Sequence, residues 1–190
     1  MTLAHTRLDV RRIGGRIGAE ITGLDLAAPP DDATVAELNV ALLAHKALFF
    51  RGQHLDDAAQ IRFASAFGPL TTAHPTVPAL AGNDNVLPVQ GGQGARANAW
   101  HTDVTFVLSP PKASTLRSLV VPAYGGDTLI ANTATAYADL PEQLRLLADG
   151  LWAVHTNDHD YAPHPQFRTE EAEQRHRVFT ARRYATAHPV

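Results

Sequence analysis

His101 and Asp103, in the segment Trp100-His101-Thr102-Asp103, are the residues whose types and spacing could most directly do chemistry. If this segment is a strand, positions i and i+2 point to the same face, so the imidazole and the carboxylate can reach one metal ion. Two histidines and one carboxylate on one face of an octahedron leave positions open for a chelating co-substrate and O2, as in non-haem Fe(II) oxygenases. The pair therefore predicts part of a metal site.

The His-x-Asp spacing is a weak signal when it is taken alone. The chain has ten histidines and 13 aspartates among 190 residues, from which about 0.7 such pairs are expected by chance. Two are present, and the other is His54-Leu55-Asp56. That pair stands where a helix is expected to begin, so Asp56 is explained as the cap of the helix.

The composition of the chain excludes several classes of function. There is no cysteine, which rules out disulfides, thiolate zinc sites and a cysteine nucleophile. The formal net charge of -3 favours neither nucleic acid nor a membrane surface as a partner. No apolar run reaches the roughly 18 residues that cross a bilayer, and the charged residues 1–13 do not form a signal peptide. A soluble cytoplasmic protein is expected.

Short strands and helices are expected to position the candidate pair. Alternating or apolar runs predict strands at residues 8–13, 16–21, 47–50, 85–89, 100–106, 113–121, 127–131 and 151–155. Capping residues and helical spacing predict helices that begin at Asp31 or Asp32 and at Asp56-Asp57, and others over residues 133–140, 141–149 and 169–183. Residues 90–99 and 157–165 are predicted to be loops.

This order of elements is typical of a mixed α/β fold with a mainly β core, a sandwich or a barrel. No linker divides the chain, so residues 1–190 are predicted to form a single domain. Trp100, Phe106 and Tyr124 are expected to be core aromatics, and Gly125-Gly126 to serve the backbone geometry of a turn. His155 and His159 are expected to lie at the surface or to support other side chains.

Several blocks of the chain, taken together and in order, indicate a protein family more specifically than any single motif does. They are residues 17–21, 41–53, 98–106 with Pro110-Pro111 after them, 122–129 and 136–140. In this order the blocks resemble the taurine dioxygenase (TauD/TfdA) family, and the resemblance covers essentially all 190 residues.

The resemblance implies a double-stranded β-helix (jelly roll) with flanking helices that holds one Fe(II), with 2-oxoglutarate and O2 as co-substrates. It implies that His101 and Asp103 are metal ligands and that the Thr128 hydroxyl binds a carboxylate of 2-oxoglutarate. His74 matches the histidine that hydrogen-bonds the sulfonate or sulfate group of the substrate. Val104 matches a residue that also contacts the substrate.

Within the family, residues 152–161 and 41–53 resemble the alkylsulfatase branch most closely. Val77 stands where the taurine enzymes carry a tyrosine, and its apolar side chain suits an alkyl chain. The resemblance implies hydroxylation of the carbon next to a sulfate ester or sulfonate, which releases sulfate or sulfite, succinate and CO2. The implied partner is a small anionic organosulfur substrate, and the full-length family implies a homo-oligomer.

The family's second histidine ligand, and the arginines that pair with the anionic groups, are expected beyond Val190. These 190 residues are therefore expected to be the N-terminal two-thirds of a dioxygenase domain, with the β-helix incomplete at its C-terminal end. A non-catalytic truncated remnant and a hydrolytic zinc enzyme with the same His/Asp pair stay open as alternatives. None of the other available histidines has the context of the missing ligand: His155, His159, His164, His176 and His188.

Overall fold

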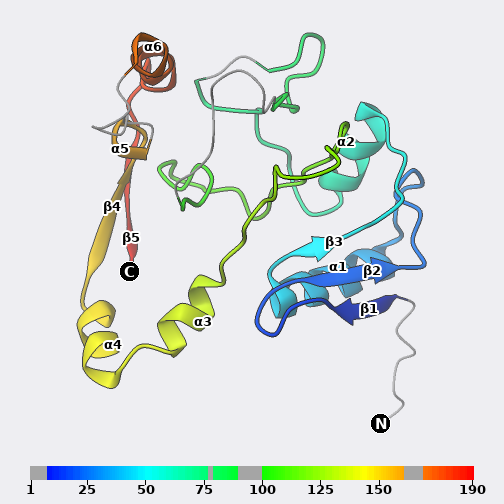
Figure 1. The fold of residues 1–190 in the computed structure, drawn as a ribbon, viewed down its shortest axis with the longest axis horizontal. Coiled ribbons are helices and arrows are strands. Elements are labelled where there is room, and N and C mark those ends of the chain that lie inside the picture. The colour runs from blue at the N-terminus through cyan, green and yellow to red at the C-terminus, as the bar shows by residue number, and fades with distance from the viewer. Residues whose placement is uncertain (1–7, 77–78, 90–99, 161–168) are drawn as a thin grey trace. The chain divides into compact units, whose positions relative to one another are not determined.

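The computed structural model describes residues 8–76, 79–89, 100–160 and 169–190, which group into two compact units. The first unit comprises the chain up to Leu70 together with Thr115–Asp139, and the second comprises Thr71–Ser114 and Leu140–Val190. Both units contain helices and strands (Figure 1), which confirms the prediction of a mixed α and β chain. No helix in the described ranges is long and apolar enough to cross a membrane.

The first unit contains a three-stranded sheet in the order β1-β2-β3. β1 (Asp9–Arg12) and β2 (Ala19–Thr22) form the predicted antiparallel pair, and the short β3 (Leu48–Phe49) runs parallel to β2. The turn between β1 and β2 needs glycine at position 18, where φ is +92° and an added Cβ would lie 3.0 Å from the Ile13 side chain.

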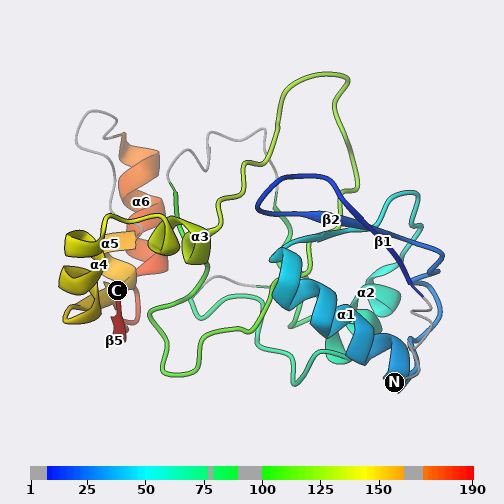
Figure 2. The ribbon, with the colours of Figure 1, turned by 90° about the horizontal axis from the view of Figure 1, so that it is seen from below.

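Two capped helices complete the core of the first unit. α1 (Asp32–His45) covers one face of the sheet (Figure 1 and Figure 2), and α2 (Asp57–Ser65) follows β3. The Asp31 carboxylate accepts from the Thr34 N–H at 2.8 Å, and the Asp56 carboxylate accepts from the Ala59 N–H at 2.7 Å. Both predicted N-caps are therefore confirmed, including the cap that explains His54-x-Asp56. The core between these elements consists of Leu8, Ile21, Leu26, Leu38, Ala41 and Phe63.

Residues 113–131 form no strand in the described part of the chain, so the strands predicted at 113–121 and 127–131 are wrong. A strand needs hydrogen bonds to a neighbouring strand, and alternation in the sequence does not supply them. Because no strand pairs here, the apolar side chains of this stretch are exposed to solvent: Leu116 is 74% exposed, Leu119 is 77% exposed and Leu129 is 74% exposed. The stretch then enters α3 (Thr133–Ala138), where Asn132 forms the N-cap as an Asn side chain can.

The second unit is organised by an antiparallel pair of strands, β4 (Trp152–Thr156) and β5 (Ala185–Pro189). α4 (Glu142–Asp149) precedes β4, and both were predicted. The single turn α5 (Asn157–Asp160) and α6 (Glu170–Phe179) lie at one end of the ladder, between its two strands in the sequence (Figure 1). Thr169 caps α6, as its position in the predicted helix suggests.

In the second unit, one observed strand was not predicted, and one predicted strand and two predicted loops differ from the structure or lie partly or wholly outside the described residues. β5 was not predicted, because Ala-Thr-Ala-His-Pro shows little strand propensity and is defined by its pairing with β4. Residues 85–89 form no strand within the described ranges, so that prediction is wrong. The loop predicted at 157–165 begins instead with α5, and residues 161–165 lie outside the described residues. The loop predicted at 90–99 also lies outside them.

Candidate metal and substrate site

His101 and Asp103 lie together in the second unit but not on the predicted strand, since His101 has irregular backbone and Asp103 begins a turn. Their Nε2 and Oδ1 atoms are 3.3 Å apart, and both side chains are more than half exposed, at 55% and 60%. Two neighbouring octahedral ligands, each about 2.1 Å from an ion, also lie about 3 Å apart. The nitrogen and oxygen atoms therefore fit two adjacent positions around a divalent ion. The sequence analysis expected this arrangement from a β-strand, and that strand prediction is wrong.

The reason for the failed strand prediction lies at Val104, the residue after the candidate ligand. Its φ is +55°, in the left-handed region that a β-branched residue rarely adopts. This conformation turns the chain and breaks the alternation of side chains that a strand would impose. The sequence interpretation that Val104 contacts substrate stays a prediction.

A set of contacts to Thr105 holds this turn against β4 and β5. The Thr105 hydroxyl lies 2.7 Å from His155 Nδ1, and its carbonyl accepts from the Thr186 hydroxyl at 3.0 Å and from His188 Nε2 at 2.7 Å. The rings of His155 and His188 meet edge to face, 4.8 Å between centroids. Three side chains from two strands thus fix the residue two positions after Asp103, and His155 and His188 serve as supports.

The aromatic residues near the site divide between core and surface. Phe106 is 1% exposed and packs against Tyr184 at 5.9 Å between ring centroids, which confirms it as a core residue. Trp100 is 71% exposed and Tyr124 is 90% exposed in the described part of the chain, so the core predictions for these two are wrong. Burial of an aromatic ring depends on which elements pack around it, and the local sequence does not specify that. Gly125 and Gly126 both have φ of +73°, which confirms their backbone role.

His74 lies close enough to the candidate metal pair for the Asp103 charge to act on it. Its Nδ1 accepts the backbone N–H of Thr76 at 3.1 Å. Because that nitrogen accepts, the neutral imidazole carries its proton on Nε2, which can donate to an anionic oxygen. The structure therefore brings four of the five predicted site residues into one neighbourhood, namely His74, His101, Asp103 and the adjacent Val104.

The titration of His74 offers a direct test of this environment. Partial burial lowers the pKa of His74 below its ordinary value of 6.5, and the Asp103 carboxylate raises it by a smaller amount. Folding therefore favours the neutral ring, and the stability it contributes is complete above pH 6.5 and is lost as the pH falls through the lowered pKa. In the metal-free chain, an NMR titration should place the His74 midpoint below that of a histidine in an unstructured peptide. Asp103→Asn should lower the midpoint further, and a midpoint at or above the peptide value would contradict the assigned environment.

Thr128 belongs to the first unit, where its side chain is exposed. The contact between Thr128 and 2-oxoglutarate stays a prediction. Val77, on which the choice of the alkylsulfatase branch partly depends, lies outside the described residues.

Within the described ranges, no three His, Cys, Asp or Glu side chains gather in a way that could hold a metal ion. His155 and His188 are engaged with Thr105, and His176 Nε2 lies 3.6 Å from the Asp158 carboxylate. His164 lies outside the described residues. Among the residues that the structure describes, the candidate metal site is thus a pair of ligands.

The sequence interpretation missed the residues that hold the site in place: Thr76, Asn157, Phe179 and Thr186. Each acts through contacts between positions far apart in the chain, such as Thr105 and Thr186, or Thr76 and Phe179. No motif marks such residues, because their types are common and their partners are not near them in the sequence.

Comparison with known proteins places the chain among dioxygenases. The family model "Taurine catabolism dioxygenase TauD, TfdA family" matches residues 9–190. The chain is 55% identical to an alpha-ketoglutarate-dependent sulfate ester dioxygenase of Pseudomonas putida, over 96% of this chain and 61% of that protein. It is 50% identical to an alkylsulfatase of Acinetobacter baylyi, over 97% of this chain and 58% of that protein. The chain thus spans about three-fifths of the length of these relatives.

Solved structures agree with the relatives found by sequence. A taurine dioxygenase from Burkholderia xenovorans superposes with a TM-score of 0.75 at 34% identity, over 97% of this chain and 58% of that one. The match covers nearly all of this chain and so supports its fold.

Proposed function

The chain belongs to the TauD/TfdA family of dioxygenases, and from this premise we propose that it is part of an Fe(II)- and 2-oxoglutarate-dependent dioxygenase that acts on sulfate esters. The observation that carries the chemistry is the 3.3 Å separation of His101 Nε2 and Asp103 Oδ1, close to His74. The choice of a sulfate ester over taurine follows the two relatives at 55% and 50% identity, whose names describe that activity.

Each predicted site residue has a role in this proposal. His101 and Asp103 would hold Fe(II), and the third ligand would come from outside the pair. Bound Fe(II), with 2-oxoglutarate and O2, supplies the oxidising power for hydroxylating a carbon–hydrogen bond. The Thr128 hydroxyl would donate to a carboxylate of 2-oxoglutarate, and His74 Nε2–H would donate to a sulfate oxygen of the substrate. Val104 would contact the substrate beside its reacting carbon.

The overall reaction balances without a further reductant. One atom of O2 enters the carbon that bears the sulfate ester, and the other enters succinate as 2-oxoglutarate loses CO2. The hydroxylated carbon then carries both a hydroxyl and a sulfate group. Loss of the hydroxyl proton forms a carbonyl as the carbon–oxygen bond to sulfate breaks, so the products are an aldehyde and sulfate.

We also propose that the two units are parts of one domain with a double-stranded β-helix core and that the full-length protein forms a homo-oligomer. The exposed apolar side chains of residues 116–130 support the first point, since they suit strands that pair within a larger sheet and are buried there. The similarity to a solved taurine dioxygenase supports it as well.

Sulfate release from a medium-chain alkyl sulfate tests the proposed function. With Fe(II), 2-oxoglutarate and O2, sulfate and succinate should form in equal amounts, and omission of any one of the three should stop both. Taurine under the same conditions should release sulfite more slowly, and equal or faster turnover of taurine would refute the sulfate ester assignment. Sulfate release that persists without 2-oxoglutarate would favour the hydrolytic zinc alternative.

An anaerobic spectrum separates an active site from a non-catalytic remnant. Addition of Fe(II) and 2-oxoglutarate should produce the visible charge-transfer absorption of the chelated metal if the chain assembles a site. A complete lack of that absorption in the 190-residue chain would favour the non-catalytic alternative for these residues by themselves.

A further inference from the structure

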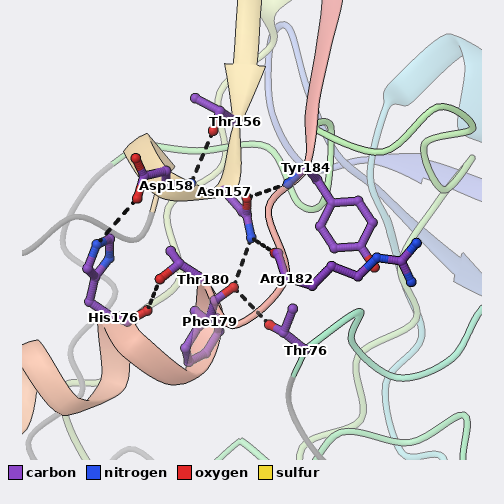
Figure 3. A network of polar contacts seen from close by, with 9 residues as sticks. All are labelled: Thr76, Thr156, Asn157, Asp158, His176, Phe179, Thr180, Arg182 and Tyr184. Atoms are coloured by element: carbon purple, nitrogen blue, oxygen red, sulfur yellow. Dashed lines mark hydrogen bonds and ion pairs between the residues drawn. The ribbon is translucent and has the colours of Figure 1, made fainter.

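Asn157 is the most completely buried polar residue among the described residues of the second unit, with 0% of its surface exposed. Its side-chain amide donates to the carbonyls of Phe179, at 2.9 Å, and of Arg182, at 2.7 Å. Its amide oxygen accepts from the Tyr184 N–H at 2.9 Å. Both amide hydrogens and the oxygen are thus used, and Asn157 ties the end of β4 to the connection between α6 and β5 (Figure 3).

The Phe179 carbonyl that Asn157 holds also accepts the Thr76 hydroxyl, at 3.0 Å (Figure 3). A carbonyl oxygen has two lone pairs and can accept both donors. Thr76 lies 103 positions before Phe179 in the sequence, so this bond fixes the loop that carries His74 to the α6–β5 connection.

Phe179 and Thr76 together define the position of the His74 ring. The Thr76 N–H donates to His74 Nδ1 at 3.1 Å, and the ring of Phe179 meets the imidazole edge to face at 4.9 Å between centroids. The bond from the Thr76 N–H sets the tautomer of His74, with the proton on Nε2. The contact with the Phe179 ring restricts the tilt of the imidazole.

No helix or strand holds His74 directly, since residues 71–76 are irregular. The backbone nearby has other anchors: the Ala73 N–H donates to the Asp84 carbonyl at 2.8 Å, and the Thr71 carbonyl accepts from the Asn85 side chain at 2.8 Å. Thr76 and Phe179 are thus two contacts that set the direction of Nε2–H. An N–H donor that recognises an anion is effective only when its direction is fixed, because the bond weakens steeply as it bends.

We propose that Thr76 and Phe179, anchored by the buried Asn157, are positioning residues that aim the His74 imidazole at the anionic sulfate group of the substrate. This inference rests on the proposed function. It predicts that the network governs substrate affinity, whereas the oxidation itself depends on the metal pair.

Thr76→Val and Thr76→Ser form the matched pair that tests the inference, in the full enzyme that carries these residues. Valine keeps the shape and the backbone N–H but removes the hydroxyl that reaches Phe179, so KM for a medium-chain alkyl sulfate should rise about 10-fold. The kcat should stay within about twofold, because binding and not the chemical step is altered. Serine keeps the hydroxyl and should restore KM to within about twofold of the unmodified enzyme.

Thr180→Val is the control for a general loss of packing. The Thr180 hydroxyl belongs to the same region but donates to the His176 carbonyl, at 2.8 Å, and not to the Phe179 carbonyl (Figure 3). This variant should leave KM unchanged. An equal rise of KM in Thr76→Val and Thr180→Val, or no rise in either, would overturn the inference.

The ring nitrogen shifts of His74, measured by 15N NMR without metal or substrate, separate this inference from the proposed function. They should report the Nε2–H tautomer in the unmodified protein. In Thr76→Val they should report a mixture of tautomers, because valine lacks the hydroxyl that bonds the loop to the Phe179 carbonyl and that lies 3.3 Å from His74 Nδ1, so the Thr76 N–H no longer stays aligned with the ring. If the enzyme turned over no sulfate ester but the shifts changed in this way, the proposed function would fail and the positioning role would stand. Unchanged shifts and unchanged KM in an active Thr76→Val enzyme would reject the positioning role alone.

Discussion

Alanine in place of Asp103 should lower the affinity for Fe(II) by at least about 100-fold and abolish 2-oxoglutarate-dependent turnover. Loss of a residue that only orients a ligand already costs about 10- to 100-fold, and Asp103 would supply an oxygen donor itself. His101→Ala should have an effect of the same size, because its Nε2 lies 3.3 Å from the Asp103 carboxylate in a position to share one ion. Anaerobic calorimetric titration with Fe(II) measures the affinity without relying on activity.

The second His-x-Asp pair of the chain provides the control for these variants. His54→Ala should leave Fe(II) affinity unchanged, because the Asp56 of this pair is engaged as the N-cap of α2. Asp56→Ala should cost about 1 kcal/mol of stability through loss of the α2 cap, again without an effect on metal affinity. If the variants at 54 and 56 weakened Fe(II) binding as much as those at 101 and 103, the assignment of the metal pair would be wrong.

Asn157→Ala should destabilise the folded chain by about 3 kcal/mol, the largest effect expected from a residue outside the metal pair. The change leaves the Arg182 carbonyl and the Tyr184 N–H without the partner they have in the structure. Each buried polar group that loses its partner costs about 1–3 kcal/mol. The Phe179 carbonyl keeps the Thr76 hydroxyl, so its loss is smaller.

Asn157→Asp extends this test because aspartate has nearly the same shape. The new carboxylate would face the carbonyls of Phe179 and Arg182, which need donors, so the variant should be at least as unstable as Asn157→Ala. Asn85→Ala is the control, since Asn85 is exposed in the same unit and makes a single bond to the Thr71 carbonyl. Urea unfolding measures all three, and a loss below about 1 kcal/mol for both Asn157 variants would contradict the structural role.

The elements that depend on neighbouring residues were predictable from the sequence. The caps at Asp31 and Asp56 each bind an N–H three positions later, so the pattern that predicts them contains both partners. The antiparallel pair β1 and β2 is joined by a short turn and is local in the same sense. The family resemblance, which the match over residues 9–190 confirms, also needed only the order of short blocks.

Contacts between distant residues decided the rest. Residues 113–121 have the alternation of a strand but form none in the described part of the chain, because strand formation requires a partner that local sequence does not name. β5 has a poor strand sequence and forms a strand because β4 pairs with it. The same reason explains the error at Trp100, whose burial was predicted from its type and not from its surroundings.

The sequence by itself determined the family, the local helix caps, and the identity of His101, Asp103 and His74 as candidate site residues. Only the tertiary structure decided how they are held: the left-handed conformation of Val104 interrupts the predicted strand directly after Asp103, and Thr105 is fixed by side chains some 50 to 80 positions away. His74 is likewise fixed through Phe179, about a hundred positions along the chain. The physical reason is that a side chain's type sets which bonds it can make, whereas its direction depends on partners that only the folded chain brings within reach.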